Sequence, residues 1–341
     1  MQYNHLLNRV LQHQDLSTAE ASHIMNQIMT GKYTPIQIGG FLIAMRMKGE
    51  AVNELTGFAK SMIAHATRIK PKVRKMVDTC GTGGDLAQTF NISTLSAIVA
   101  AGAGVPIAKH GNRSVSSRCG SADLLEALGL NLKLTPLQVQ RCIEKVGIGF
   151  LFAPVFHSAM KYAIAPRKEL GVRTVFNMLG PLTNPARAFA QVIGVYDEKL
   201  TSVFAQTLRN LGVKRAMIVH GDDGLDEITI SGPSRISEIT TDGRIVSYKI
   251  APEDFGMPTG SKADLVSSGI KENVKITHLI LDGKDIGSRR DAVALNAGAA
   301  IYLSGQAKTL GEGVEKAIQS IETGKAKAKL EKWIAFTKRG R

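Results

Sequence analysis

Residues 76–94 read MVDTCGTGGDLAQTFNIST, in which a short apolar run leads into a glycine-rich loop and then into the start of a helix. Three glycines within four residues let backbone N–H groups approach an anion without interference from side chains. A helix N-terminus near Asn91 adds unpaired N–H donors and the positive end of a dipole. The loop lacks the GK[ST] ending of a Walker A loop, and Leu86 stands where GxGxxG requires its last glycine. The segment predicts a phosphate or pyrophosphate site, and glycine density alone leaves a tight structural turn as the alternative.

The chain before this loop follows a different pattern. Over residues 1–70 apolar residues recur at helical spacing, without a strand pattern. Ser17 with Glu20 predicts a capping box, Thr34-Pro35 predicts a second helix start, and Asn53 is expected to cap a third helix. We therefore expect a small all-helical domain at this end of the chain.

After the basic linker TRIKPKVRK, residues 67–75, short apolar runs alternate with helical segments. Strands are expected at 76–78, 105–108, 148–152, 191–196, 216–220 and 244–250, and helices at 93–103, 116–128, 198–211 and 290–303. Such alternation is typical of an α/β fold, with a mostly parallel central sheet flanked by helices. Ligands are then expected in the loops beyond the carboxyl ends of the strands.

A second loop, KHGNRSVSS at residues 109–117, follows an expected strand and precedes an expected helix. Lys109 and Arg113 are suited to neutralising phosphate, and the hydroxyls of Ser116 and Ser117 to donating to its oxygens. Capping or a surface position is the alternative for each residue taken singly. A packed histidine is as consistent with His110 as a substrate contact.

A third loop contains the adjacent carboxylates Asp226-Glu227 after the apolar run at 216–219. Mg²⁺ prefers one or two carboxylates while substrate phosphates complete its coordination. A solvated pair is the alternative for two acidic residues alone, but two neighbouring phosphate loops favour the metal.

Composition narrows the class of protein. The chain has 341 residues, 44% of them hydrophobic, and contains no apolar run long enough to span a membrane. The first residues lack the apolar region of a signal peptide, and three widely spaced cysteines fit a reducing cytoplasm. The net charge of +14 could indicate nucleic acid as a partner. Aromatic residues make up only 5% of the chain, however, so few side chains could stack on bases, and the basic residues are mostly spread out. The basic cluster at 325–341 is expected to be a solvated helix face.

Together these motifs resemble the anthranilate phosphoribosyltransferase family over nearly the whole chain. The resemblance is carried by GTGGDxxxTFNIST at 81–94, KHGNRxxSS at 109–117, GSADLLEALG at 120–129, PRKELGVRTVFNMLGPLTNP at 166–185 and HGDDGLDE at 220–227. Nucleoside phosphorylases share a KHGNR-like loop, but differ at the first loop and lack the stretch at 166–185.

The resemblance implies a set of site residues. Phosphoribosyl pyrophosphate would be bound by Gly81, Gly84, Asp85, Thr89, Asn91, Ile92, Ser93, Thr94, Lys109, His110, Gly111, Asn112, Arg113, Ser114, Val115, Ser116, Ser117 and Ser121. Two Mg²⁺ ions would accompany it at Ser93, Asp226 and Glu227, and anthranilate would contact Gly81, Asn112 and Arg167, with His157 and Tyr162 on its access path. Lys109, Asn112 and Arg167 are expected closest to the chemistry. Without the resemblance, Arg167 would be interpreted as a surface arginine.

The resemblance also implies an activity and an assembly. The enzyme would transfer phosphoribosyl to anthranilate in tryptophan biosynthesis. The helical domain, residues 1–70 joined by helices from about 160–185, would form a homodimer, and residues 71–341 would form the α/β catalytic domain. Two alternatives remain, a nucleoside phosphorylase of the same fold and a non-enzymatic relative that binds nucleic acid.

Overall fold

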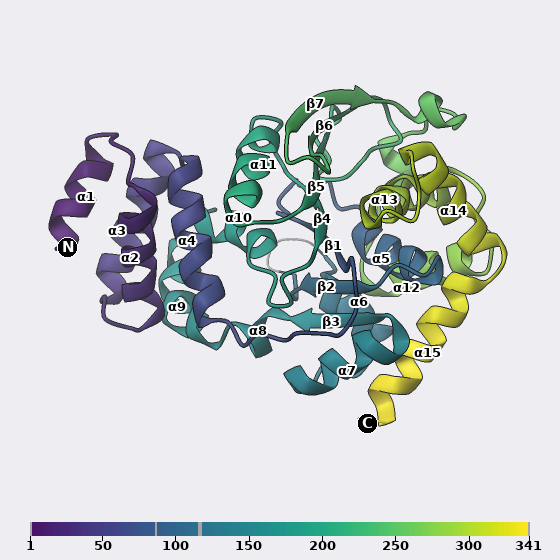
Figure 1. Cartoon of the computed structure of the whole chain (residues 1–341), viewed down its shortest axis with the longest axis horizontal. Coiled ribbons are helices and arrows are strands. Elements are labelled where there is room, and N and C mark those ends of the chain that lie inside the picture. The colour runs from purple at the N-terminus through teal and green to yellow at the C-terminus, as the bar shows by residue number, and fades with distance from the viewer. Residues whose placement is uncertain (1, 86, 115–117, 340–341) are drawn as a thin grey trace.

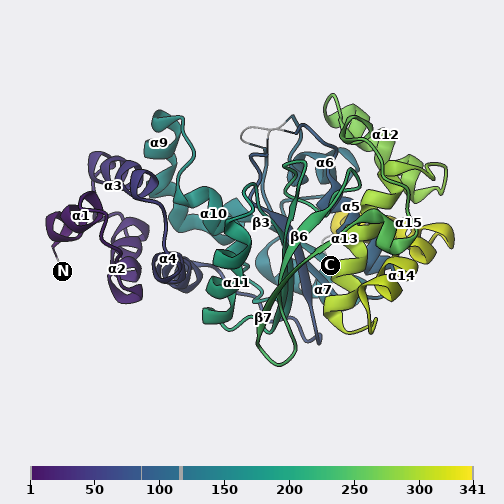
Figure 2. The same ribbon diagram turned by 90° about the horizontal axis from the view of Figure 1, so that it is seen from above.

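A helical part and an α/β part lie side by side in the computed structural model, which describes residues 2–85, 87–114 and 118–339 (Figure 1). The first four helices gather at one end of the molecule, away from the sheet (Figures 1 and 2). They are α1 (Tyr3–Leu11), α2 (Thr18–Met29), α3 (Pro35–Lys48) and α4 (Val52–His65). The predicted fold class, a small helical domain and a larger α/β domain, is confirmed.

Local sequence sets the ends of these helices. Ser17 and Glu20 form the predicted capping box, with the Ser17 N–H donating to Glu20 Oε2 over 2.9 Å. The helix start predicted at Thr34-Pro35 is confirmed, and Thr34 and Gln37 form a capping box there. The prediction for Asn53 is wrong, because α4 begins two residues earlier with Ala51 as its cap. Glu54 accepts the Ala51 N–H over 2.8 Å, so the carboxylate at the third helical position satisfies the first turn.

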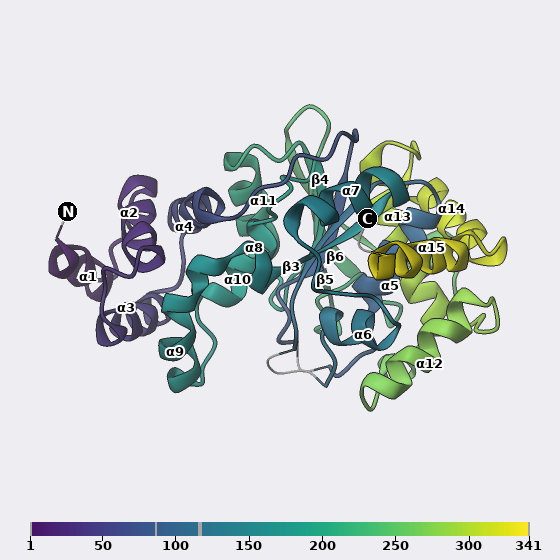
Figure 3. The ribbon, with the colours of Figure 1, turned by 90° about the horizontal axis from the view of Figure 1, so that it is seen from below.

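Later segments of the chain return to this helical part. After α8 (Ala153–Phe156) and a short 3₁₀ turn (Ser158–Met160), helix α9 (Lys161–Leu170) packs against α2 and α3. Helix α10 (Val175–Leu182) packs against α3, α4 and α11 (Leu200–Asn210). Seen from below, α9 and α10 lie between the first four helices and the sheet (Figure 3).

The central sheet has seven strands in the order β3-β2-β1-β4-β5-β6-β7. Their bounds are β1 Val77–Gly81, β2 Ile107–Gly111, β3 Ile148–Phe152, β4 Ala190–Gly194, β5 Arg215–Gly221, β6 Ser234–Ile239 and β7 Ile245–Ile250. Strands β1 to β5 are parallel, while β6 and β7 extend the sheet in antiparallel pairing. The sheet is therefore mostly parallel, as predicted.

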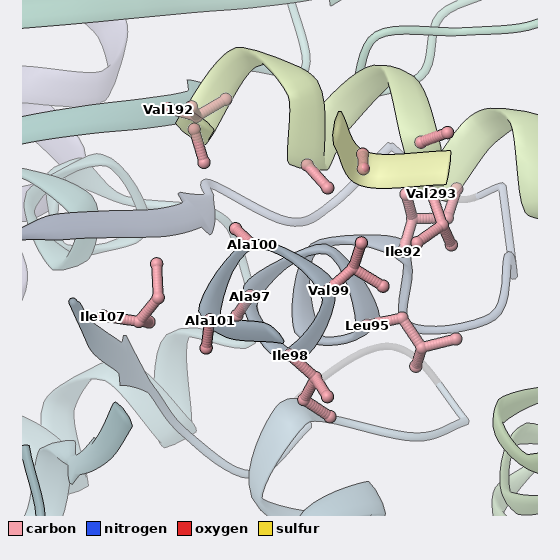
Figure 4. Close-up of a cluster of buried hydrophobic side chains, with 14 of the residues drawn as sticks. Ile92, Leu95, Ala97, Ile98, Val99, Ala100, Ala101, Ile107, Val192 and Val293 are labelled. Atoms are coloured by element: carbon pink, nitrogen blue, oxygen red, sulfur yellow. The ribbon is translucent and has the colours of Figure 1, made fainter. Parts of the chain in front are cut away.

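Helices cover the side of the sheet away from the helical part (Figure 1). They are α5 (Ile92–Gly102), α6 (Ser121–Ala127), α12 (Ile270–Leu281), α13 (Ser288–Ser304), α14 (Leu310–Glu322) and α15 (Lys325–Arg339), with 3₁₀ turns at Pro252–Phe255 and Lys262–Leu265. Helix α7 (Pro136–Val146) packs instead against the edge strand β3. Helix α5 is buried on nearly all sides, and Figure 4 shows its Ile92 beside Val293 of α13 and its Ala100 and Ala101 on the side toward Ile107 of β2. The small side chains of Ala97, Ala100 and Ala101 allow α5 to pack closely against the sheet. This packing fixes the N-terminus of α5, and with it the end of the glycine loop that precedes the helix.

Three elements differ from the sequence expectations. The helix expected at 116–128 begins only at Ser121, since Asp123 accepts the Gly120 N–H over 3.0 Å and sets the cap there. Strand β2 lies two to three residues later than expected. Strand β6 was not predicted, because its sequence SRISEI mixes polar and apolar residues. Residues on both faces of this strand are buried, so no simple apolar pattern marks it.

Candidate active site

The glycine loop and the two acidic residues meet at the carboxyl ends of β1 and β4. A Cβ on Gly81 would lie 2.6 Å from Asp226 Oδ2, and one on Gly194 would lie 1.5 Å from the Asp226 carbonyl oxygen. Only glycine at both strand ends lets the acidic loop approach so closely. The Gly83 N–H then donates to Asp226 Oδ2 over 2.8 Å.

This region forms a cleft of about 310 Å³ that contains most of the residues expected to bind the donor. It is lined by Gly81, Gly84, Asp85, Thr89, Asn91, Ile92, Ser93, Lys109, His110, Gly111, Asn112, Arg113, Ser114, Ser121, Asp226 and Glu227. Thr94 is fully buried behind it, 3.5 Å from Asn91 Oδ1. Val115, Ser116 and Ser117 lie outside the described residues.

Asp226 and Glu227 place two acidic side chains close together in the cleft. Burial and the neighbouring Asp85 raise the pKa of Asp226 to about 8, and burial and Asp226 raise the pKa of Glu227 well above its usual value. In the described parts of the chain, neither carboxylate has a lysine or arginine within salt-bridge distance. Crowded carboxylates of this kind are stabilised by a bound cation, and their oxygen atoms suit Mg²⁺.

The described residues contain no group of three or more His, Cys, Asp or Glu side chains placed to hold a metal. Mg²⁺ requires only one or two protein carboxylates, because substrate phosphates and water supply the other oxygens. Ser93 stands beside the pair, and its N–H donates to Glu227 Oε1 over 3.2 Å. The residues present therefore fit a magnesium site completed by the substrate.

Lys109 is the buried cation nearest this pair. Its Nζ donates to the Thr79 carbonyl over 2.6 Å and to Ser93 Oγ over 3.3 Å, and the side chain is only 1% exposed. Burial lowers its pKa, while Asp78 is the largest influence opposing that shift. The ammonium thus ties β1, β2 and the start of α5 together behind the cleft, in addition to offsetting charge within it.

The second loop presents its residues in different ways. Arg113 pairs with Asp123 and Glu126, each over 2.8 Å, so its charge is shared with two carboxylates. Ser121 Oγ donates to the Asn112 carbonyl over 3.1 Å and fixes the turn of the loop. Asn91 is held by the side chain of Asn273, whose Oδ1 accepts the Asn91 N–H over 2.8 Å.

A second cavity of about 310 Å³ adjoins the cleft and is more apolar. Its lining residues include Met62, Pro154, His157, Ile164, Arg167 and Phe176. His110 and Asn112 line both spaces, so the two cavities meet at the second loop.

Arg167 supplies the charge in this second cavity. Its guanidinium lies 5.1 Å from the centre of the Phe176 ring, and burial lowers its pKa. Within the described ranges no carboxylate pairs with it. A half-buried, unpaired guanidinium beside an aromatic ring is suited to a planar carboxylate ligand.

Gly81, expected to contact the acceptor, and Tyr162, expected on its access path, do not line this second cavity. The ring of Tyr162 packs over Gly31 at the end of α2, does not line the second cavity, and is 39% exposed. Gly81 lines the first cleft but not the second.

His110 and His157 stay neutral at physiological pH. Burial lowers the pKa of His110 to about 3 and that of His157 to about 4, and the two rings lie 5.1 Å apart. His110 Nδ1 lies 3.1 Å from the Gly180 carbonyl, so Nδ1 carries the proton and Nε2 is left as an acceptor. Both Nε2 atoms are buried without a partner among the described residues.

These shifts predict that the protein loses stability in acid. Between pH 6.5 and pH 4 the unfolded chain binds protons at these histidines and the folded protein does not, so stability falls as the pH falls. The free energy of unfolding should drop by about 2 kcal/mol per histidine between pH 7 and pH 5. Urea unfolding of wild type and His157→Gln at both pH values checks this. Equal losses in the two proteins would contradict it.

Arg173, Tyr196 and Asn273 contact the site loops but were not expected there. Arg173 Nη2 donates to the Gly84 carbonyl over 2.6 Å, and its guanidinium lies 3.9 Å from the centre of the Tyr196 ring. The only sequence signal for Arg173 is its place inside the stretch at 166–185.

Comparisons with known proteins agree over the whole chain. Residues 4–66 match the helical bundle domain of a glycosyl transferase family, and residues 73–327 match its a/b domain. The chain is 53% identical over 336 residues to the anthranilate phosphoribosyltransferase of Desulfosudis oleivorans, covering 98% of this chain and 99% of that protein.

Two solved structures of anthranilate phosphoribosyltransferases superpose closely. That from Thermus thermophilus has a TM-score of 0.92 at 41% identity, covering 97% of this chain and 99% of that one. That from Saccharomyces cerevisiae, in complex with PRPP and Mg, has a TM-score of 0.91 at 28% identity, covering 99% of this chain and 98% of that one. The yeast enzyme has also been solved with 4-fluoroanthranilate.

Proposed function

Because the chain belongs to the anthranilate phosphoribosyltransferase family, we propose that its two adjoining cavities bind the two substrates of that reaction. The enzyme transfers the phosphoribosyl group of 5-phosphoribosyl 1-pyrophosphate to anthranilate, giving N-(5-phosphoribosyl)anthranilate and pyrophosphate in tryptophan biosynthesis. The observation that carries the assignment is the junction of an anion cleft with a more apolar cavity at His110 and Asn112.

The donor belongs in the cleft. Its pyrophosphate would lie against the glycine loop, whose N–H groups and neighbouring helix N-terminus favour negative charge. Ser93, Asp226 and Glu227 would hold the metal. Bound Mg²⁺ would neutralise charge that develops on the departing pyrophosphate.

The acceptor belongs in the second cavity. Arg167 would bind the anthranilate carboxylate through two parallel hydrogen bonds, and the ring would lie among the apolar lining residues. Asn112, on the border between the cavities, would orient the amine toward the ribose. The amine nitrogen forms a bond to C1′ as the bond from C1′ to the pyrophosphate oxygen breaks, with inversion through an oxocarbenium-like state. The nitrogen, positively charged after the attack, then loses one proton to water or to the departing pyrophosphate. Positioning and electrostatic stabilisation supply most of the acceleration.

One assay tests the assignment and separates it from the alternatives. Anthranilate fluorescence should disappear when phosphoribosyl pyrophosphate and Mg²⁺ are added together, and should persist when either is omitted. Release of a base from a nucleoside and phosphate, without anthranilate consumption, would favour a phosphorylase instead. Salt-dependent DNA binding without turnover would favour the nucleic-acid-binding alternative.

We expect two Mg²⁺ ions with each bound donor. The Asp226 carboxylate accepts a hydrogen bond from the glycine loop, and the Glu227 carboxylate accepts one from the start of α5. The two carboxylates therefore lie toward different sides of the cleft. Titration with Mn²⁺, followed by electron paramagnetic resonance in the presence of the donor, should reach two ions per chain. Saturation at one ion would contradict this stoichiometry.

The helical part is the proposed homodimer interface. Three large apolar side chains stand exposed on it, with Leu11 58%, Ile36 87% and Met47 76% exposed. Burial of such side chains between two copies would contribute about 1.5–3 kcal/mol each to the stability of a dimer.

For localisation we propose the cytoplasm, in keeping with only three cysteines in the sequence, widely spaced at positions 80, 119 and 142. No described helix is long and apolar enough to cross a membrane.

The variant Ile36→Glu should weaken such a dimer by about 10- to 100-fold, because it places a charge in an apolar interface. Light scattering after size exclusion should then show a shift from twice the chain mass toward the chain mass. Ile286→Glu, at a residue 74% exposed in the α/β part, is the matched control and should leave the mass unchanged. A wild type of single-chain mass would refute the dimer.

A further inference from the structure

The glycine loop has few restraints of its own. Gly83 and Gly84 have φ values of +64° and +83°, a conformation that glycine adopts easily and also leaves easily. Two contacts fix the loop from opposite sides. Gly83 N–H is bound by Asp226, and the Gly84 carbonyl is bound by Arg173 over 2.6 Å.

Arg173 is itself held in place before it contacts the loop. Its guanidinium stacks on the Tyr196 ring at 3.9 Å, and the Tyr196 N–H donates to Thr82 Oγ1 over 3.3 Å. A Cβ at Gly84 would lie 2.8 Å from Arg173 Nη2, so glycine is needed for this approach. Arg173 does not line the cleft and therefore acts on a substrate through the loop.

The backbone of Arg173 is tied to the helical part. Arg46, in the last turn of α3, donates from Nη1 to the Arg173 carbonyl over 2.7 Å. Two hydrogen bonds thus connect α3 to Gly84 through Arg173. Arg46 and Arg173 are 127 positions apart in the sequence, and Arg173 and Gly84 are 89 positions apart.

We propose that Arg173 is a positioning residue that holds the glycine loop in its anion-binding shape and makes that shape depend on the placement of α3. The proposal rests on the assignment of this loop to the pyrophosphate of the donor. Loss of the Arg173 side chain frees the Gly84 carbonyl, so the N–H groups of the loop lose their common orientation. Loss of the Arg46 side chain loosens Arg173 from the helical part and weakens the same restraint.

Steady-state kinetics of Arg173→Met, Arg46→Met and the double variant test the proposal. Arg173→Met should raise KM for phosphoribosyl pyrophosphate by about 10- to 100-fold, the effect of one charged hydrogen bond, and leave KM for anthranilate within about twofold. Arg173→Lys should recover part of the loss, since an ammonium retains one donor but not the stacked plane. Because Arg46 acts through Arg173, the double variant should be no worse than Arg173→Met.

A direct binding measurement separates this proposal from the proposed function. Calorimetric titration with inorganic pyrophosphate and Mg²⁺ should show the same 10- to 100-fold weakening in Arg173→Met, whatever the enzyme's acceptor. Arg244→Met, at an exposed arginine in the β6–β7 turn, is the control and should bind like wild type. Unchanged pyrophosphate affinity in Arg173→Met would overturn the positioning role. Additive losses in the double variant would overturn the link to α3.

Discussion

The double variant Asp226→Asn/Glu227→Gln should lose about 10³-fold or more of its turnover with Mg²⁺, because it removes both carboxylates that fit the metal. The protein should nevertheless remain folded. Burial is the main cause that raises the pKa of both groups above the unfolded values, with repulsion from Asp85 adding to it at Asp226 and repulsion from Asp226 adding to it at Glu227. Between the unfolded and the folded pKa values the folded state binds more protons than the unfolded state, so the free energy of unfolding falls as the pH rises toward neutrality. The neutral amides do not ionise in either state, so the double variant should keep this stability at neutral pH.

Two readouts therefore move in opposite directions. In the absence of metal, the melting temperature of the double variant should equal or exceed that of wild type, and added Mg²⁺ with pyrophosphate should stabilise only wild type. Asp222→Asn is a matched control, since Asp222 lies in the same loop but is exposed and pairs with Lys249 over 2.7 Å. Turnover within tenfold of wild type in the double variant would refute the metal assignment.

The variant Arg167→Met should raise KM for anthranilate by about 100-fold, because the acceptor carboxylate loses its paired hydrogen bonds. KM for the donor should change little, since Arg167 lines only the second cavity. Stability should be kept, because Arg167 has no carboxylate partner in the described chain and a methionine retains the contact with Phe176. Lys168→Met, at the exposed neighbouring residue, serves as the control.

An acceptor without a carboxylate sharpens this test. Wild type should use aniline poorly, by about the same factor that Arg167→Met loses with anthranilate. Arg167→Met should then discriminate little between the two amines. If the variant lost the same factor with aniline as with anthranilate, Arg167 would not be the carboxylate ligand.

Much of the fold follows from local patterns. Capping residues at Ser17 and Thr34 mark helix starts because a cap forms within one turn of the chain. Strand β3, Ile148–Phe152, lies where its apolar run predicts a strand. Strand β6 escaped prediction because its sequence SRISEI mixes polar and apolar residues and shows no apolar run.

The candidate site divides in the same way. The sequence by itself determined which chemistry is present: a glycine loop for an anion, adjacent carboxylates for a hard cation, and a motif stretch that contains Arg167. These features are readable because residue type and short spacing suffice to recognise them. The tertiary structure alone decided that the Lys109 side chain is buried in the wall of the cleft, that the Tyr162 ring packs over Gly31, and that Arg173 donates to the Gly84 carbonyl. Those contacts depend on a strand order in which β1 lies beside β4 instead of β3, and on helices that return to the first domain, so no local pattern encodes them.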